Sequence, residues 1–92
     1  MRELRYSARF EADYKRVSRN PRYRNIDPIL IEVIDLLLLD KSLPAKFLDH
    51  PLKGSYIGTR ECHIKPNLLL IYSKTELNEL VLIRIGSHSA LF

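Results

Sequence analysis

The chain has 92 residues, of which 46% are apolar and 28% are charged, with three glycines and five prolines. This length and composition are typical of one globular domain and exclude a disordered chain, a collagen-like chain and a pair of independent cores. No apolar run is long enough to cross a bilayer, no secretory signal is expected, and the single cysteine, Cys62, cannot form an intrachain disulfide. We therefore expect one domain over residues 1–92, in a cytoplasmic protein without membrane contact.

The net charge of +4 is concentrated in the first quarter of the chain. Residues 1–24 carry eight basic side chains against three acidic ones, whereas residues 25–92 are close to neutral. Seven of the eight basic residues are arginines, whose guanidinium group matches phosphate better than an ammonium group does. This excess indicates a surface for nucleic acid, with a solvated helix face or an acidic protein partner as the alternatives.

The chain is predicted to begin with a strand followed by a helix. Residues 3–6 form the short strand, and Ser7 is the N-cap of a helix that extends to about Arg19. Apolar side chains recur along this helix at the i, i+4 and i+7 spacing of a buried stripe, at Phe10, Tyr14 and Val17. Three arginines fall away from that stripe and should be exposed: Arg9, Arg16 and Arg19.

A second helix is predicted from Asp27 to about Leu39. Asp27 is expected to be its N-cap and Pro28 its first helical residue, a combination that favours helix initiation. Almost every other side chain is apolar, so this helix should be covered on more than one side. A sheet and the first helix can supply that cover, or a partner chain can supply part of it.

The second half of the chain predicts a loop and then three strands. Pro44 and Pro51 interrupt residues 41–53, which we expect to be a loop. The strands are expected at 60–64, 68–73 and 77–85. Because these strands are short and closely spaced, they should form an antiparallel meander, with the helices on one face and the other face free for a ligand.

Side-chain alternation along the strands predicts which residues lie on the ligand face. Glu61 and His63 should share one face of their strand, opposite Cys62. In the last strand, Arg84 should lie on the ligand face, and the side chains expected to meet the helices are Val81, Ile83 and Ile85. If the extended course continues past Gly86, a further histidine, His88, joins Arg84.

The three histidines, His50, His63 and His88, allow several kinds of chemistry. Zinc binding would need a compact ligand spacing, which they lack. A nucleophilic pair of Cys62 and His63 is disfavoured, because adjacent strand residues point to opposite faces. Cleavage of RNA by its own 2′-hydroxyl needs a base, an acid and a cation, which histidines and an arginine supply without a metal or another cofactor. Ordinary structural histidines are the remaining alternative.

Three blocks of the second half resemble a signature of the RelE superfamily of bacterial toxins, and specifically its YafQ-like branch. The first is Leu-Asp-His-Pro-Leu-Lys-Gly at 48–54. The second is Arg-Glu-Cys-His-Ile-Lys-Pro at 60–66, followed by Leu-Leu-Leu-Ile-Tyr at 68–72. The third is the ending Arg-Ile-Gly-Ser-His-Ser-Ala-Leu-Phe at 84–92. The first forty residues match only in helix pattern and basic character.

The resemblance implies an α+β domain in the order strand-helix-helix-strand-strand-strand, with two helices on an antiparallel sheet. It implies an endoribonuclease that cuts mRNA in the ribosomal A site, a cognate antitoxin, and operator DNA bound only by the toxin–antitoxin complex. The catalytic set it implies is His50, His63, His88 and Arg84. The residues expected to bind RNA are Phe92, which would contact a base, Asn67, Lys53, Arg60, Arg9, Arg16 and Arg19.

One position departs from the family pattern. YafQ-like proteins often carry Asp at the fourth residue after the second histidine, where this chain has Asn67. An amide can accept a hydrogen bond but cannot carry a proton between groups. The alternative function on the same fold is a non-enzymatic ParE-like toxin or binding module that grips a protein target. Retention of three histidines together with Arg84 favours the enzyme.

Overall fold

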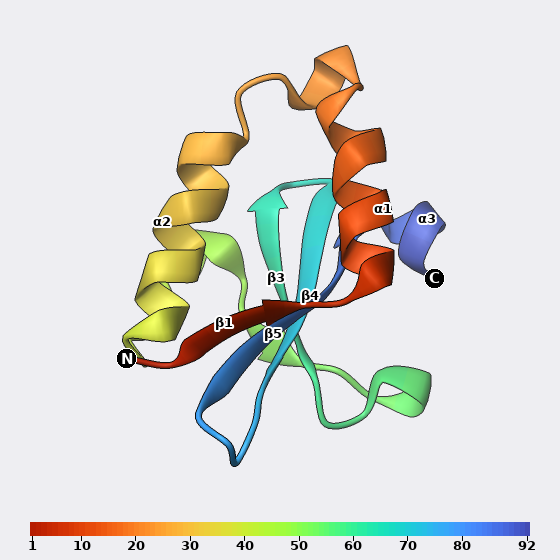
Figure 1. Ribbon diagram of the computed structural model, residues 1–92. Helices are drawn as coiled ribbons and strands as arrows, with labels where there is room; N and C mark the ends of the chain where they lie inside the picture. The colour runs from red at the N-terminus through yellow and green to blue at the C-terminus, as the bar shows by residue number, and fades with distance from the viewer.

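The computed structural model describes all residues from 1 to 92 and contains a five-stranded sheet in the order β1-β5-β4-β3-β2 (Figure 1). The elements in chain order are β1 (Glu3–Tyr6), α1 (Ala8–Ser18), α2 (Asp27–Leu38), β2 (His50–Pro51), β3 (Arg60–Lys65), β4 (Leu68–Lys74), β5 (Glu79–Gly86) and α3 (His88–Leu91). Three single 3-10 turns lie at Pro21–Tyr23, Ala45–Phe47 and Gly54–Tyr56. None of the helices combines the length and the apolar character that a membrane span requires.

The predicted meander of β3, β4 and β5 is confirmed, but the sheet is mixed rather than wholly antiparallel. β1 pairs with β5 in parallel, so the first strand lies beside the last one. The expected loop at 41–53 contains β2, which pairs with β3 and forms the edge of the sheet. The sequence analysis missed the parallel pairing of β1 with β5 because pairing between distant segments leaves no periodic signal. It missed β2 because a strand of two residues is too short to show one.

The helix starts agree with the prediction at α1 and differ by one residue at α2. The hydroxyl of Ser7 accepts a hydrogen bond from the Phe10 N–H, as an N-cap should. The N-cap of α2 is Ile26, so the prediction of Asp27 as N-cap is wrong. The Asp27 carboxylate instead accepts a 2.6 Å hydrogen bond from the Tyr14 hydroxyl, which ties α2 to α1.

The main core lies between the sheet and the antiparallel pair α1 and α2 (Figure 1). Cys62 and Ile64 point into it, as alternation predicts, and Val33 of α2 is completely buried against them in the same cluster. Burial, assisted by the nearby carboxylates of Asp49 and Glu61, raises the pKa of the Cys62 thiol to about 12. Cys62 is therefore an unreactive core residue at neutral pH.

The predicted orientation of β5 is wrong for most of the strand. Leu80 and Leu82, not Val81 and Ile83, point into the main core. A register shift follows, since Tyr72 pairs with Leu82 whereas its neighbour Ile71 pairs with Arg84. This bulge leaves Ile83 without a cross-strand partner and reverses the alternation beyond it. Ile85 therefore does point into the main core, and Arg84 does lie on the opposite face of the sheet, as expected, although the alternation used to predict them was interrupted.

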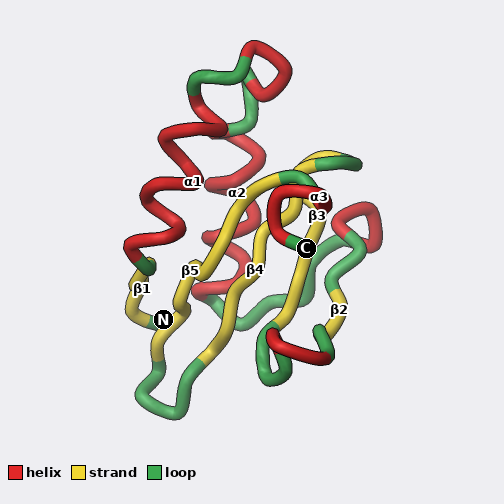
Figure 2. The backbone as a smooth tube through the Cα atoms, turned by 90° about the vertical axis from the view of Figure 1, so that its right-hand side faces the viewer, coloured by secondary structure: helices red, strands yellow, loops and turns green.

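The face expected to be free for a ligand is closed at its centre by a second, smaller core. Leu69 and Ile71 of the sheet are covered by Leu91 of α3, with Leu52 and Tyr56 packed around them. The chain turns back here because the Ser87 hydroxyl accepts from the Ala90 N–H and caps α3. The extended course past Gly86, which was the condition for placing His88 beside Arg84, is therefore absent. In Figure 2, α3 lies over the strands close to the carboxyl end of the chain.

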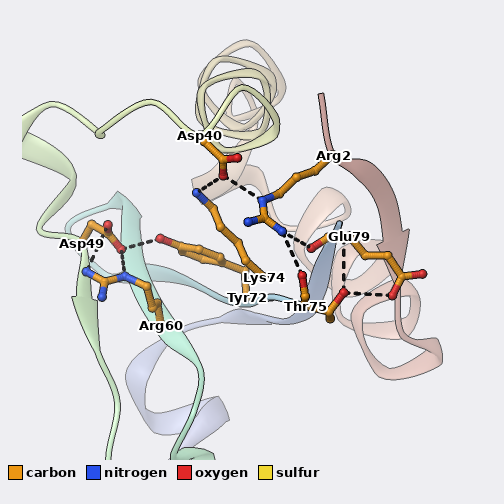
Figure 3. A network of polar contacts seen from close by, with 8 residues as sticks. All are labelled: Arg2, Asp40, Asp49, Arg60, Tyr72, Lys74, Thr75 and Glu79. Carbon is orange, nitrogen blue, oxygen red and sulfur yellow. Dashed lines mark hydrogen bonds and ion pairs between the residues drawn. The ribbon is translucent and has the colours of Figure 1, made fainter. Parts of the chain in front are cut away.

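Polar side chains fasten the amino-terminal segment and the end of α2 to the sheet (Figure 3). Asp40, which follows α2, accepts hydrogen bonds from Arg2 at 2.7 Å and from Lys74 at 2.9 Å. These hydrogen bonds, from Arg2 first and Lys74 second, lower the pKa of Asp40 to about 2. The guanidinium of Arg2 also donates to the carbonyl oxygens of Thr75 and Glu79 at the turn between β4 and β5.

Leu70 in the central strand β4 is completely buried in the main core. We expect Leu70→Ala to lower the free energy of unfolding by about 2–5 kcal/mol, because it removes buried methyl groups and leaves a cavity. Chemical denaturation measures this. The matched control is Leu77→Ala, at a side chain that is 80% exposed, where the change should stay within about 0.5 kcal/mol. Equal effects of the two substitutions would contradict this assignment of the core.

Candidate active site

Two of the three histidines meet around one buried carboxylate. The Nε2 atoms of His50 and His63 lie 3.6 Å from the two different oxygens of Glu61, whose side chain is 7% exposed. The imidazole ring centres are 6.3 Å apart. His50 and Glu61 are cross-strand partners on β2 and β3, and His63 follows two residues later on the same face. The sheet itself therefore holds the cluster together.

Strand pairing places Arg84 in the same row of the sheet as this cluster. Glu61 pairs with Ile71 on β4, and Ile71 pairs with Arg84 on β5, so these residues form one row across the sheet. Two strand spacings separate the backbones at Glu61 and Arg84, about 10 Å in all. The small core around Ile71 lies between them. The carboxylate with its two histidines thus lies on one side of that core and Arg84 on the other.

Arg84 is held by an ion pair that the sequence analysis did not anticipate. Its Nε and one terminal nitrogen donate to the two oxygens of Asp13 at 2.6 and 3.1 Å, and both side chains are almost completely buried. The Ile85 N–H also donates to Asp13, at 3.2 Å. Asp13 therefore occupies one edge of the guanidinium group. The hydroxyl of Tyr56 also adds to the raised pKa of Arg84, after the larger effect of Asp13.

The pKa of Asp13 reflects a competition between burial and its partners. Burial by itself would raise that pKa, but the hydrogen bonds from Arg84 and Ile85 and the positive charges of Arg84 and Arg16 outweigh it. The net pKa therefore lies below the ordinary value. Asp13 remains a carboxylate at neutral pH and fixes the position of Arg84.

The third histidine lies on α3 in an aromatic group. The rings of His88 and Phe92 are 4.9 Å apart, and Tyr56 meets Phe92 edge-on at 5.7 Å. Phe92 is 56% exposed, so much of this residue remains open to solvent. No hydrogen bond, ion pair or ring contact joins this group to the cluster of His50 and His63, and the structure therefore places the three predicted histidines in two separate groups.

The predicted RNA-binding residues fall into different surroundings. Asn67, in the turn between β3 and β4, lines a groove together with Arg16 of α1 and His88 of α3. Its backbone carbonyl accepts from the Tyr23 hydroxyl at 3.4 Å. Arg9, Arg19 and Lys53 are exposed, and Arg16 reaches back to Asp13 at 3.4 Å.

Arg60 takes part in a structural network beside the core (Figure 3). Its guanidinium donates twice to Asp49, at 3.2 and 3.3 Å, and the Tyr72 hydroxyl donates to the same carboxylate at 2.6 Å. The bond to Asp49 is the main cause of the raised pKa of Arg60. Burial first, and Asp49 second, raise the pKa of the Tyr72 hydroxyl. The Arg60 side chain nevertheless remains 43% exposed, so part of it is open to another partner.

The sequence analysis missed three features of the site: Asp13, Tyr56 and the central position of Glu61. A signal for Asp13 was present, because it lies three residues after Phe10 and four before Val17, on the buried stripe of α1. An acid on such a stripe indicates a buried partner. Nothing comparable marks Tyr56. The side chains of His, Cys, Asp and Glu form no group of three or more that is disposed to hold a metal ion.

The fold is that of toxins from bacterial type II toxin–antitoxin systems. A family model described as "Bacterial toxin of type II toxin-antitoxin system, YafQ" matches residues 2–92. The chain therefore belongs to the YafQ toxin family, which confirms the resemblance seen in its sequence blocks.

Relatives share both sequence and structure over the full chain. The mRNA interferase toxin YafQ of Escherichia coli K12 is 36% identical over 93 residues, which cover 99% of this chain and 96% of the relative. A copper-bound mutant toxin from Helicobacter pylori is 40% identical, with a TM-score of 0.91 and complete coverage of both chains. The E. coli DinJ–YafQ complex matches with a TM-score of 0.82 and 36% identity, covering 100% of this chain and 99% of the other.

The ion pair of Asp13 predicts a specific loss of stability in acid. Because the fold lowers the pKa of Asp13, its ionised form stabilises the folded state above the unfolded pKa, about 3.9, and this contribution disappears as the pH falls through the folded pKa. We expect Asp13→Asn to cost about 1–3 kcal/mol at neutral pH and to flatten the dependence of stability on pH in that acid range. Urea unfolding between pH 2 and pH 7 measures both effects.

The control for this experiment is Glu11→Gln, at an exposed residue of the same helix. Its unfolding curves should follow those of the wild type throughout. Curves of Asp13→Asn that coincide with the wild type at every pH would show that the pair does not stabilise the fold.

Proposed function

We propose that this YafQ-family toxin is a ribosome-dependent endoribonuclease that cleaves mRNA in the ribosomal A site. The observation that carries the proposal is the convergence of the Nε2 atoms of His50 and His63 around Glu61, in the same row of the sheet as Arg84. The related E. coli protein is an mRNA interferase. This kinship and the histidine cluster favour the enzyme over the ParE-like binding module.

The proposed reaction is attack of the RNA 2′-hydroxyl on the adjacent phosphorus. One histidine takes the hydroxyl proton as general base, and another gives a proton to the leaving 5′-oxygen as general acid. Arg84 lies on the same face and stabilises the charge that collects on the phosphate oxygens, with the guanidinium edge that Asp13 leaves free. The products are a fragment ending in a 2′,3′-cyclic phosphate and a fragment with a free 5′-hydroxyl. This route needs neither a metal ion nor another cofactor.

Residues around these groups are proposed to bind the RNA. Phe92 offers the exposed part of its side chain to a base. Asn67 shares a groove with His88, where its amide can orient a neighbouring group by hydrogen bonding. Basic side chains on the surrounding surface are proposed to contact phosphates of mRNA or ribosomal RNA: Arg9, Arg16, Arg19, Lys53 and the exposed part of Arg60.

The proposed protein partner is a cognate antitoxin, as DinJ is in the E. coli complex. An acidic antitoxin would complement the basic surface of α1. An apolar groove between β1, α1 and α2 offers it a second surface, at which Leu4, Tyr6 and Ile31 are exposed. We propose that the toxin–antitoxin complex, rather than the toxin alone, binds operator DNA.

The test of this function is cleavage of mRNA on programmed ribosomes by the purified chain. We expect His50→Ala, His63→Ala and His88→Ala each to reduce the cleavage rate by about 10²–10⁴-fold, the scale of a lost acid or base. Each variant should remain folded, since all three side chains are at least partly exposed. Full activity in two of the three variants would refute the assignment, and a 5′-phosphate on the downstream fragment would refute the 2′-hydroxyl mechanism.

The basic face of α1 should contribute affinity rather than chemistry. We expect the triple reversal of Arg9, Arg16 and Arg19 to Glu to weaken ribosome binding and to reduce its dependence on salt concentration, because fewer counterions are released. Thermal stability should change little. Binding of the triple variant and of the control Lys41→Glu, exposed beyond the end of α2, is compared at several salt concentrations. Unchanged binding by the triple variant would show that this face does not contact RNA.

A further inference from the structure

Leu48 has a backbone conformation that a leucine rarely adopts. Its φ and ψ angles are 50° and 42°, in the left-handed region. The other non-glycine residues with positive φ are Asp40 and Asn78, which belong to the types that tolerate it. The Leu48 side chain is 59% exposed, so little of it is packed to offset this strain. A strained residue two positions before a predicted catalytic histidine indicates that the conformation has a use.

The left-handed turn directs the carbonyl oxygen of Leu48 toward the ring of His50. The Nδ1 of His50 lies 2.7 Å from that oxygen, a short hydrogen bond. A carbonyl oxygen can only accept, so Nδ1 is the donor and carries a proton. Nε2, which lies on the side of Glu61, is then the ring nitrogen left to exchange a proton with another group.

The turn is anchored on both sides of Leu48. Before it, the Phe47 ring is buried in the main core. After it, the Asp49 carboxylate accepts two hydrogen bonds from Arg60, at 3.2 and 3.3 Å, and one from the Tyr72 hydroxyl at 2.6 Å (Figure 3). Tyr72 is itself almost completely buried in the central strand β4. Both neighbours of Leu48 are therefore held, and the chain between them keeps the left-handed turn.

We propose that the left-handed turn at Leu48, anchored by Asp49, is a positioning device that holds the His50 ring and keeps the proton of its neutral form on Nδ1. A neutral histidine side chain in water prefers the proton on Nε2, so the turn reverses that preference. Leu48 acts through its backbone and Asp49 acts through Leu48, without contact with RNA. The effect of this device on cleavage rests on the proposed function, in which Nε2 exchanges the proton.

Two substitutions of Leu48 separate the role of its backbone from that of its side chain. Leu48→Gly removes the side chain but keeps the left-handed conformation accessible, because glycine adopts positive φ without strain. Leu48→Pro excludes that conformation, because the proline ring holds φ at about −65°. A role of the carbonyl group predicts different results for the two variants, whereas a role of the leucine side chain predicts the same loss in both.

The matched control is Asn78→Pro, at another left-handed residue. The Asn78 N–H donates to the carbonyl oxygen of the residue three positions earlier at 3.2 Å, as the Leu48 N–H does at 3.0 Å. Asn78 lies in the turn between β4 and β5 and forms no hydrogen bond with a histidine. The same substitution there damages a turn of the same kind without altering the surroundings of His50.

The direct test reads the tautomer of each imidazole of the full chain by two-bond ¹H–¹⁵N correlation at alkaline pH, where the neutral rings are observed. We expect His50 to carry its proton on Nδ1 in the wild type and in Leu48→Gly. In Leu48→Pro, most of His50 should carry it on Nε2. Asn78→Pro should leave His50 as in the wild type, and His88 on α3 is the internal reference in every variant.

A second pair of variants tests the anchor and gives the reading if Leu48→Pro does not fold. Tyr72→Phe removes one hydrogen bond to Asp49 and keeps the buried ring, whereas Asp49→Ala removes all three. We expect the fraction of His50 with its proton on Nε2 to rise from the wild type to Tyr72→Phe and again to Asp49→Ala.

Single-turnover cleavage on programmed ribosomes measures the consequence for activity. We expect Leu48→Pro to reduce the cleavage rate by about 10- to 100-fold, less than the loss of an acid or base itself, with little change in the half-saturating ribosome concentration. Leu48→Gly should recover most of that rate. Asn78→Pro should cleave at the rate of the wild type.

The wild-type tautomer of His50 in Leu48→Pro, or in both anchor variants, would overturn the inference whether or not the chain cleaves RNA. Equal losses in Leu48→Gly and Leu48→Pro would also overturn it, because they would assign the role to the leucine side chain. If the tautomers change as expected but the wild-type chain cleaves no mRNA, the proposed function fails, while the positioning of His50 stands.

Discussion

A buried ion pair between Asp13 and Arg84 joins the first helix to the last strand. Its partners are separated by 71 residues in the sequence, and the Asp13 carboxylate also accepts the N–H of Ile85. β1 covers only the first half of β5, so α1 must supply the donors and acceptors that the remaining edge lacks. The Ser7 hydroxyl does the same when it donates to the carbonyl oxygen of Ile83. These contacts fix the helix against the sheet and, with it, the direction of the Arg84 side chain.

The row of paired residues across β2, β3, β4 and β5 organises the rest of the site. It places a carboxylate with two imidazoles on one side of a small apolar core and a fixed guanidinium on the other. This core, formed by Leu69, Ile71 and Leu91, lies between the two groups and covers the centre of that face of the sheet. Under the proposed function, the RNA would therefore pass over α3, where the Phe92 ring is exposed, rather than lie flat on the sheet.

A YafQ-family toxin has to present two kinds of surface. The proposed RNA-binding surface is basic and polar, whereas the groove between β1, α1 and α2 is apolar and lies on the side of the main core. Both surfaces share α1, whose arginines lie on one side and whose Phe10 and Tyr14 line the groove on the other. A partner that covers this helix would thus neutralise the charge that the proposed function uses for binding RNA.

The sequence predicts those features that depend on residues close together in the chain. These are the order of the main elements, the N-cap of α1, the core-facing side of β3 and the family itself. The bulge in β5 could not be predicted, since it arises where β4 and β5 fall out of register, and it alone restores Arg84 to the expected face. The pairing of Arg84 with Asp13 and the convergence of two histidines on Glu61 also depend on contacts between distant segments. The sequence by itself determined where apolar and charged side chains lie along each helix and strand. Only the tertiary structure decided which charged groups meet, because burial and strand register set their partners.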